Sequence, residues 1–571
     1  MSSDISATGD IPALEPRTGL PAPGSRHASD FAALAPDLAR DLIPRDPASP
    51  DPAAPDPASP DPGTPGRGAA GRGRALTVMA AAGIGIAVLI MIAASLVRGG
   101  WMLPPVPMPA LGPPWEIPVH HVSADLVTYA LWLAALLGAG GVVAGLLAIG
   151  QGARISPRIL LITGLLTVAV LTVLPPAGST DALDYATYGR LLALGHSPYV
   201  ATPAYLRHLH NAFAHSVPLV WRHYVSVYGP LATLEQFAAA KLGGASAARI
   251  TFWLKLWDSA AFAAVTLVLD RLLRHDPARR LRAHLLWTVN PLLLWDLIAA
   301  GHLDVLPVMA GLLGLLMLGE QQAGTRPALW QVAAAGALLG IAADIKINYA
   351  LFGLAAAWAL RRSLLALALA GAAALAVLVP SYAYFGMPAV RALLGRRNQS
   401  SADNFYRVFL PHGWHHYLGT IAAVLVVTVA ILALRKLPPG AAARPAIRPA
   451  VALCAAWLFL WPYQLPCYDS MIICVLVLFP ASRLDWLVLA RLTAGTISNM
   501  PGNPYLQHSH LLRLTDHFAV RIVAPLVILA AAVTLVGLCL AGNWKLRDSP
   551  GPGRVRGETR APEPAAQPGS A

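Results

Sequence analysis

Long runs of apolar residues, separated by short polar joints, dominate the chain from residue 75 onward. A hydrocarbon core of about 30 Å requires roughly 20 apolar residues per helix, and the sequence supplies many runs of this kind. Backbone groups in lipid must be hydrogen-bonded within their own segment, and the sequence lacks the alternation typical of a β-barrel. The pattern therefore predicts an all-α fold, a polytopic transmembrane helical bundle.

The runs predict about 11 to 14 membrane spans, although the shorter ones fall below the length needed to cross upright. The segment 177–245 interrupts them with two amphipathic stretches, near 185–194 and 231–240, which are typical of interfacial or re-entrant helices. The apolar runs lie near 75–97, 124–149, 159–174, 249–270, 283–300, 302–319, 328–343, 346–360, 363–380, 418–434, 448–463, 470–482, 485–498 and 519–541.

Basic residues gather at the ends of these runs, as the positive-inside rule describes. If the spans alternate in direction, the basic stretches at 67–74, 271–282, 361–362 and 435–448 all face the same side, the cytoplasm. Most of the basic residues behind the formal net charge of +13 thus orient the protein in the membrane. The charge does not indicate nucleic acid, because the basic residues do not gather on one soluble domain with interleaved aromatic residues. Both termini are expected in the cytoplasm.

The composition agrees with a membrane protein. The chain is 56% hydrophobic and 12% charged, against roughly 25% charged residues in ordinary soluble domains. The abundance of Arg, Ala, Gly and Pro suggests a GC-rich bacterial genome, so we expect a multi-pass protein of the bacterial inner (plasma) membrane, with membrane lipids among its partners. Four cysteines are too few and too scattered for a disulfide framework or a metal site, and we predict no metal or other cofactor.

The ends of the chain differ from its middle. Residues 1–74 are rich in Pro, Ala and Asp, and cannot bury enough apolar area to offset the loss of chain entropy. They predict a disordered cytoplasmic tail. A transmembrane domain over 75–545 and a second disordered cytoplasmic tail over 546–571 follow.

Two acidic residues open the long segment after the third span. Asp181 and Asp184 stand three residues apart, and share one face if the segment is helical. A carboxylate just above the bilayer could accept the proton of an attacking hydroxyl. The alternative is a helix N-cap followed by a favourable first-turn acid, and spacing alone favours this structural role slightly.

Three further ionisable residues lie near predicted hairpins. His302 and Asp304 suit an acceptor hydroxyl or a phosphate, whereas the structural alternative is a polar turn whose Asp304 caps the next helix. Lys346 follows Asp344 among apolar neighbours. It either binds a phosphate or forms a mutually neutralising pair with Asp344.

Arginines and aromatic residues on the same side complete the candidate site. Arg396 and Arg397 oppose the positive-inside bias, which favours a phosphorylated lipid or another anionic headgroup as their partner. Aromatic belts explain interfacial tyrosines without any catalysis, and this alternative stays open for the tyrosines here. The other candidate substrate-binding residues are Arg190, Tyr199, Tyr228, Gln464 and Tyr468.

Four sequence elements follow one another in a set order. They are DALDYATYGR at 181–190 with GHSPY at 195–199, VYGPL at 227–231, NPLLL at 290–294 with GHLD at 301–304, and ADIK at 343–346. In this order they resemble the bacterial polyprenyl-phosphomannose-dependent α-mannosyltransferases of the GT-C class. The resemblance covers roughly residues 160–480.

The resemblance implies an integral membrane glycosyltransferase domain with a catalytic aspartate in an early external loop, a position that Asp181 matches best. It implies inverting transfer of a sugar, here mannose, from a polyprenyl-phosphate donor to a glycan or glycolipid hydroxyl on the extracytoplasmic face. Asp184 stands where a small polar residue is expected, which leaves the base between two acids. Cys467 replaces an aromatic residue before Tyr468, which leaves the sugar open.

Other classes of membrane protein stay open on the sequence alone. A multi-pass transporter or lipid-linked-glycan flippase would also show many spans, but we expect inverted repeats with broken helices there, and find no convincing internal repeat. A non-catalytic membrane subunit is the third alternative. A cavity that is open only to the outer face and ringed by Asp181 and His302 would favour the transferase, and a polar path through the bilayer centre would favour transport.

Overall fold

The computed structural model describes residues 67–96, 122–319, 327–395, 400–438, 444–499 and 509–544, apart from short gaps inside these ranges, together with residues 113 and 115. The chain divides after Thr64, and all described residues belong to the second unit. The predicted tails over 1–74 and 546–571 lie outside the described residues, except that 67–74 form the first turns of a helix.

Every regular element among the described residues is a helix. The first are α1 (Arg67–Leu96), α2 (Ala124–Gly150), α3 (Pro157–Val173), α4 (Asp181–Ala193), α5 (Tyr205–His208), α6 (Pro230–Gly243), α7 (Ala247–Leu272), α8 (Pro277–Ala283), α9 (Pro291–Leu293) and α10 (Val305–Met317). Then come α11 (Leu329–Ile345), α12 (Ala350–Leu360), α13 (Leu364–Phe385), α14 (Met387–Leu394), α15 (Tyr406–Phe409), α16 (Leu418–Lys436), α17 (Ile447–Leu460), α18 (Asp469–Leu476), α19 (Arg483–Asn499), α20 (His510–Phe518) and α21 (Ala524–Ala541).

Shorter helical segments of other types join these helices. Within the described ranges, the π-helical segments include η3 (His284–Thr288), η4 (Leu294–Ala299) and η9 (Ala519–Val523). The 3₁₀-helical segments there include η5 (Ile347–Tyr349), η6 (His412–Tyr417) and η7 (Pro466–Tyr468). The bounds follow most of the predicted apolar runs, but the run at 283–300 is divided into η3, α9 and η4 and does not form one continuous helix. The all-α prediction is confirmed for the described part of the chain.

Six helices among the described residues are long and apolar enough to cross a membrane. They contain 19 to 29 residues, and the last of them joins α20, η9 and α21 into one helix. Six further apolar helices, such as α3 and α17, have 10–17 residues. The predicted count of spans stays a prediction, because a helix of this length reaches only about 15–25 Å at 1.5 Å per residue.

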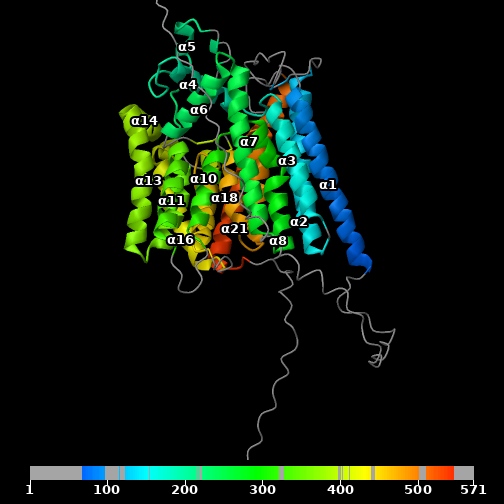
Figure 1. Ribbon diagram of the computed structural model, residues 1–571. Helices are drawn as coiled ribbons and strands as arrows, with labels where there is room; N and C mark the ends of the chain where they lie inside the picture. Colours follow the sequence, from blue (N-terminus) through cyan, green and yellow to red (C-terminus); the bar gives the residue numbers. More distant parts are fainter. Residues whose placement is uncertain are drawn as a thin grey trace, which may run out of the picture. The chain divides into compact units, whose positions relative to one another are not determined.

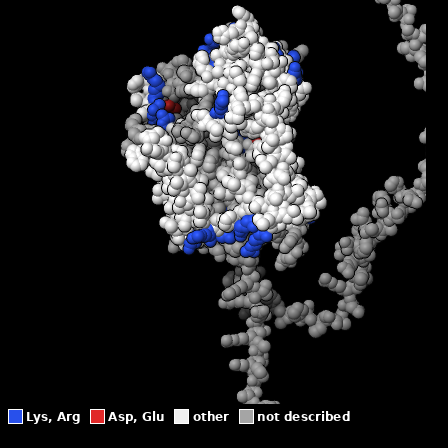
Figure 2. All heavy atoms as spheres, turned by 90° about the vertical axis from the view of Figure 1, so that its left-hand side faces the viewer, with Lys and Arg blue, Asp and Glu red and all other residues white. Residues whose placement is uncertain are grey.

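The long helices run side by side, and α4, α5 and α6 lie together at one end of the bundle (Figure 1). Figure 2 shows Lys and Arg side chains in an upper and a lower band on the face that it presents, with a belt of uncharged residues between the bands. A charged side chain in the hydrocarbon layer is costly, so this separation is typical of a helical membrane protein.

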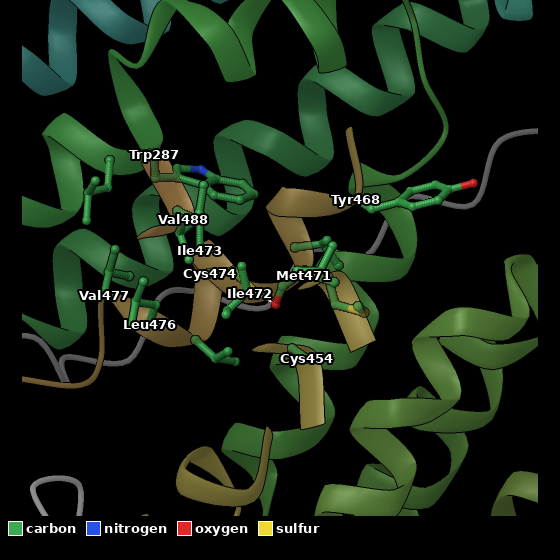
Figure 3. Packing of buried hydrophobic residues seen from close by; sticks show 14 of the residues in the cluster. Trp287, Cys454, Tyr468, Met471, Ile472, Ile473, Cys474, Leu476, Val477 and Val488 are labelled. Carbon is green, nitrogen blue, oxygen red and sulfur yellow. Dashed lines mark hydrogen bonds between the residues drawn. The ribbon is translucent and has the colours of Figure 1, made fainter. Parts of the chain in front are cut away.

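The centre of the bundle is built around α18, whose eight residues are all buried. Figure 3 shows Met471, Ile472 and Cys474 of this helix among other buried side chains, while the ring of Tyr468 points away from the cluster. All four cysteines are buried and free. Because α18 follows Tyr468 directly, this core holds the position of that ring.

The two amphipathic stretches of the long segment form α4 and α6. The sequence predicts interfacial or re-entrant helices here, but nine of the 13 residues of α4 are buried. The helix α4 packs against α6 and α7. The apolar residues that made this stretch look interfacial thus contact other helices, which gives the acids of α4 a protein environment.

Candidate active site

A cavity of about 500 Å³ lies where α4, η5, the end of α14 and the turn before α18 meet, within the ~300–1,000 Å³ typical of ligand pockets. Five predicted site residues line it: Asp181, Asp184, Tyr228, Lys346 and Tyr468. The other lining residues are Tyr188, Trp221, Val225, Val227, Ile347, Asn348, Leu393, Leu394, Trp457, Trp461, Tyr463 and Leu465.

Asp181 is the first residue of α4 and faces His302, which lies in the turn before α10. Its Oδ2 is 3.4 Å from the Nε2 of His302. The turn depends on Gly301, whose φ of +67° is rarely adopted by other residues. The other ring nitrogen of His302, Nδ1, bonds the backbone carbonyl of Asp296. Because a carbonyl only accepts, Nδ1 carries a proton, and His302 donates to Asp181 only as an imidazolium.

The charge states of the pair follow from these contacts. Burial raises the pKa of Asp181, but the hydrogen bond and charge of His302 and the charge of Lys346 lower it more, so that the net pKa lies below its ordinary value. Burial lowers the pKa of His302, but the bond and charge of Asp181 raise it more, to above its ordinary value. Both directions favour a carboxylate beside an imidazolium.

Asp184 lies one turn further along α4 and has different surroundings. The residue is 3% exposed, and neither carboxyl oxygen has a hydrogen-bond partner among the described residues. Burial, and then the negative charge of Asp181, raise the pKa of Asp184 well above its ordinary value. A helix N-terminus favours an anion by only about 0.3–1 kcal/mol. Desolvating an unpaired carboxylate costs several kcal/mol, so the neutral acid is favoured.

Neither acid caps α4 in the described structure. The residue before the helix is Thr180, and no side-chain cap hydrogen bond is formed there. The Oδ2 of Asp181 instead lies 3.4 Å from the Nε2 of His302. The backbone N–H of Asp181 donates to the hydroxyl of Ser179 at 3.2 Å. The N-cap part of the structural alternative is therefore wrong for these side chains, whereas both acids do lie in the first turn of α4.

Lys346 reaches the cavity from the end of α11. Its Nζ donates to both carboxylate oxygens of Asp304, at 2.9 and 2.8 Å, and the Tyr349 hydroxyl donates to Asp304 Oδ1 at 2.9 Å. Nζ also lies 4.3 Å from the ring centroid of Tyr468 and 5.8 Å from that of Tyr228. These contacts hold one cation, with two electron-rich rings beside it, at the wall of the cavity.

Two structural alternatives for these residues are wrong. Asp304 precedes α10, but its side chain makes no cap hydrogen bond to that helix. Lys346 pairs with Asp304 and not with Asp344. Asp344 instead accepts from the backbone N–H of Leu231 at 2.9 Å and from the hydroxyl of Ser381. The sequence neighbours Asp344 and Lys346 thus serve different parts of the fold.

Tyr199 and Arg190 lie outside the cavity lining. The hydroxyl of Tyr199 donates to the carbonyl of Tyr228 at 2.8 Å and lies 2.8 Å from the Thr233 hydroxyl. Arg190 donates to the carbonyl of Gly244 at 3.3 Å. Tyr199 therefore holds the backbone of a cavity residue, and Arg190 fastens the end of α4 to the loop before α7.

Gln464 belongs to a buried network that sequence reasoning missed. Arg491, on α19, donates to Gln464 Oε1 at 3.1 Å and to the carbonyl of Leu458 at 2.9 Å, and forms an ion pair with Asp469. The network fixes both ends of the turn before α18, which carries Tyr468. An arginine inside the apolar run 485–498 was the signal that could have revealed it.

The remaining predicted residues, Arg396 and Arg397, lie outside the described residues. The aromatic wall of the cavity adds residues beyond the predicted set, including Trp457, Trp461 and Tyr463. The Trp461-Pro462-Tyr463 element was the available signal, and an aromatic belt alone would have explained it. Among the described residues, no group of three His, Cys, Asp or Glu side chains is suited to hold a metal ion.

Comparisons with known proteins agree with the resemblance seen in the sequence. Residues 81–362 match the family model described as alpha-(1->6)-mannopyranosyltransferase, N-terminal domain. A probable alpha-(1->6)-mannopyranosyltransferase of Mycolicibacterium smegmatis is 30% identical over 177 residues, which cover 31% of this chain and 30% of that protein. The match thus spans about a third of the relative's length. No solved structure matches significantly. Residues 81–362, slightly less than half of the chain, are thus similar to the α-(1→6)-mannopyranosyltransferase family.

Proposed function

We propose that this protein is a membrane mannosyltransferase that uses a polyprenyl-phosphate-linked mannose as donor and a hydroxyl of a glycan or glycolipid as acceptor. The observation that carries the proposal is a single cavity lined by both Asp181 and Lys346. One supplies a base and the other a cation, which are the two functions that glycosyl transfer from a lipid phosphate requires. The family match supports the sugar and the reaction class.

Asp181 is the base in this proposal. Its carboxylate is held ionised by His302 and lies beside the cavity, where an acceptor hydroxyl can reach it. A general base must lie within hydrogen-bonding reach of the proton that it removes. The imidazolium of His302 occupies Oδ2, so Oδ1 is the oxygen assigned to the acceptor.

Lys346 binds the phosphate of the donor in the same proposal. Its ammonium has three N–H donors, and the two oxygens of Asp304 lie within hydrogen-bonding distance. Asp304 is fully buried, so the ammonium is held at the cavity wall from behind. A cation fixed in this way stabilises the negative charge that grows on the leaving phosphate, without reorganising during the reaction.

The chemical step is then a direct displacement at the anomeric carbon. The acceptor oxygen forms a bond to that carbon as the bond from the carbon to the phosphate oxygen breaks. The bonding electron pair leaves with the phosphate, and the acceptor proton passes to Asp181. Attack opposite the leaving group inverts the configuration at the anomeric carbon.

The rest of the cavity suits such substrates. The aromatic residues Trp457, Trp461 and Tyr463 offer flat apolar faces on which a sugar ring can pack. Leu393 and Leu394, at the end of α14, add an apolar edge next to the candidate membrane span α13. Positive-inside topology supports an extracytoplasmic position for this end of the bundle.

The proposal is tested with full-length protein in membrane vesicles, using labelled polyprenyl-phosphate mannose and an oligomannoside acceptor. Asp181→Asn is expected to lower kcat about 100- to 10,000-fold, the usual worth of a general base. Arg361→Gln, at an exposed position between α12 and α13, is the matched control and keeps wild-type transfer. Transfer from a nucleotide sugar without a lipid intermediate would contradict the donor assignment. Uptake of lipid-linked sugar without transfer would favour a transporter.

A further inference from the structure

The two acids of α4 line one cavity, but within the described part of the chain a cation lies beside Asp181 and not beside Asp184. Asp181 is 3.4 Å from His302 and also experiences the positive charge of Lys346. The pKa of Asp184 is raised by its burial and by the negative charge of Asp181. Two neighbouring carboxylates cannot both ionise cheaply in such a site. The surroundings thus separate the acids into an ionised and a neutral member.

The hydrogen-bonding capacity of Asp184 is unused in the structure. Both carboxyl oxygens are buried and lack a hydrogen-bond partner among the described residues, although the residue lines the cavity. A buried polar group without a partner is costly, so a bound ligand that pairs with this group gains affinity. A neutral carboxyl group offers one O–H donor and one or more acceptor sites.

The chemistry of the cavity indicates which part of a ligand meets Asp184. A phosphate oxygen only accepts hydrogen bonds, and the cation that suits it is Lys346, which is paired with Asp304 and contacts the ring of Tyr468. A sugar hydroxyl both donates and accepts, which matches the two capacities of a neutral carboxyl group. The aromatic side chains around the cavity favour a sugar ring in the same place.

We infer that Asp184 is a neutral sugar-binding residue, which donates its carboxyl proton to a hydroxyl oxygen of the transferred sugar while Asp181 alone acts as the base. The inference rests on the proposed function and deepens it by giving the second acid a separate role. It also explains why an acid is tolerated one turn from the base. In its neutral form it adds no negative charge beside Asp181 or the departing phosphate.

Matched variants of the two acids test this division in full-length protein reconstituted into vesicles. Asp184→Asn keeps a neutral donor and acceptor and is expected to lower kcat/KM by less than about tenfold, whereas Asp184→Leu loses about 10- to 100-fold, mainly through the KM of the donor. Asp181→Asn makes the same change of side chain as Asp184→Asn, but it is expected to lower kcat by about 100-fold or more. If Asp184→Asn is as impaired in kcat as Asp181→Asn, a carboxylate is required and the inference is overturned.

Infrared difference spectroscopy supplies a readout that does not depend on turnover. At neutral pH, subtracting the Asp184→Asn spectrum from wild type is expected to leave the carbonyl stretch of a protonated carboxyl group. The same subtraction with Asp181→Asn is expected to leave no such band. An active wild type without the Asp184 band refutes this inference alone. A wild type that transfers no mannose refutes the proposed function itself.

Discussion

The carboxylate of Asp344, near the end of α11, accepts a hydrogen bond of 2.9 Å from the backbone N–H of Leu231, in the first turn of α6. A second bond, from the N–H of Gly229 to the carbonyl of Ile345 at 3.2 Å, lies beside it. Tyr228 precedes this junction and Lys346 follows it. The junction therefore sets the position of two cavity residues that are 118 positions apart in the chain.

Removing the junction should weaken transfer without removing any cavity residue. Asp344→Ala is expected to lower kcat/KM about tenfold, because a hydrogen bond to a charged group contributes roughly 1.5–3 kcal/mol. Asp344→Asn retains an acceptor for Leu231 and a donor for Ser381, and should recover most of the loss. Initial rates in vesicles measure the effect. Equal losses in both variants would show that the negative charge matters more than the junction.

Variants of Lys346 distinguish its contribution to folding stability from its role in sugar transfer. Lys346→Gln leaves Asp304 buried beside an uncharged partner, which is expected to cost about 3–5 kcal/mol of folding stability. The double variant Lys346→Gln, Asp304→Asn removes both charges and should restore most of the stability, measured as the temperature of thermal unfolding in detergent. Transfer should stay low in both, because neither has the ammonium. Recovery of transfer in the double variant would exclude Lys346 as the phosphate partner.

The positions of the helices were largely predictable from the sequence. The run at 124–149 became α2 at Ala124–Gly150, and the run at 418–434 became α16 at Leu418–Lys436. Local hydropathy decides where a helix lies in a membrane protein, so a single sequence carries that information. The burial of α4 was not predictable in the same way. Its apolar face contacts α6 and α7, and those contacts depend on how distant segments pack.

The candidate site shows the same division. The chemical types and the order of the motifs indicated that Asp181, His302 and Lys346 would come together, and the first two lie 3.4 Å apart. The sequence left two partners open for Lys346, a phosphate or Asp344. In the structure Lys346 pairs with Asp304, which lies 42 positions away in the chain. Arg491 was not predicted as a site residue because its partners, Leu458 in α17 and Gln464 in the turn before α18, are distant from it in the sequence. The packing of distant helices determines such pairs, and the hydropathy pattern of a single sequence does not show how these helices pack.

The pair of Asp181 and His302 predicts a pH dependence. Asp181 has a lowered pKa, so it stays ionised below its ordinary value of 3.8. His302 has a raised pKa, so it stays charged above its ordinary value of 6.5. Transfer is thus expected to fall on the alkaline side as His302 loses its proton, with a midpoint above 6.5. The stabilising effect of the pair is complete below that ordinary value and is lost as pH rises through the raised pKa.

A histidine variant checks the source of this fall. His302→Asn cannot titrate in the same range, so its rate, although lower, should stay level where the wild type declines. Rates of both proteins from pH 5.5 to 9, a range chosen around the ordinary histidine pKa of about 6.5, provide the comparison. An unchanged alkaline fall in His302→Asn would assign the titration to another group.

Gly229 offers a test of how closely the cavity wall must pack. A Cβ at this position would lie 1.4 Å from the carbonyl oxygen of Asp344, so Gly229→Ala forces α6 and α11 apart. Overpacking of this kind typically costs about 1–3 kcal/mol. Thermal unfolding should show that loss, and the KM for the lipid donor should rise because Tyr228 moves relative to Lys346.

Gly353 is the matched control, since it lies within α12 and a Cβ there would meet no atom within 4 Å. Gly353→Ala should be neutral or stabilise the protein by up to about 1 kcal/mol, because glycine is unfavourable inside a helix. If Gly229→Ala behaves like Gly353→Ala in both unfolding and KM, then the approach of α6 to α11 does not position the cavity residues. The roles assigned to Asp344 and its neighbours would then have to be explained by local contacts alone.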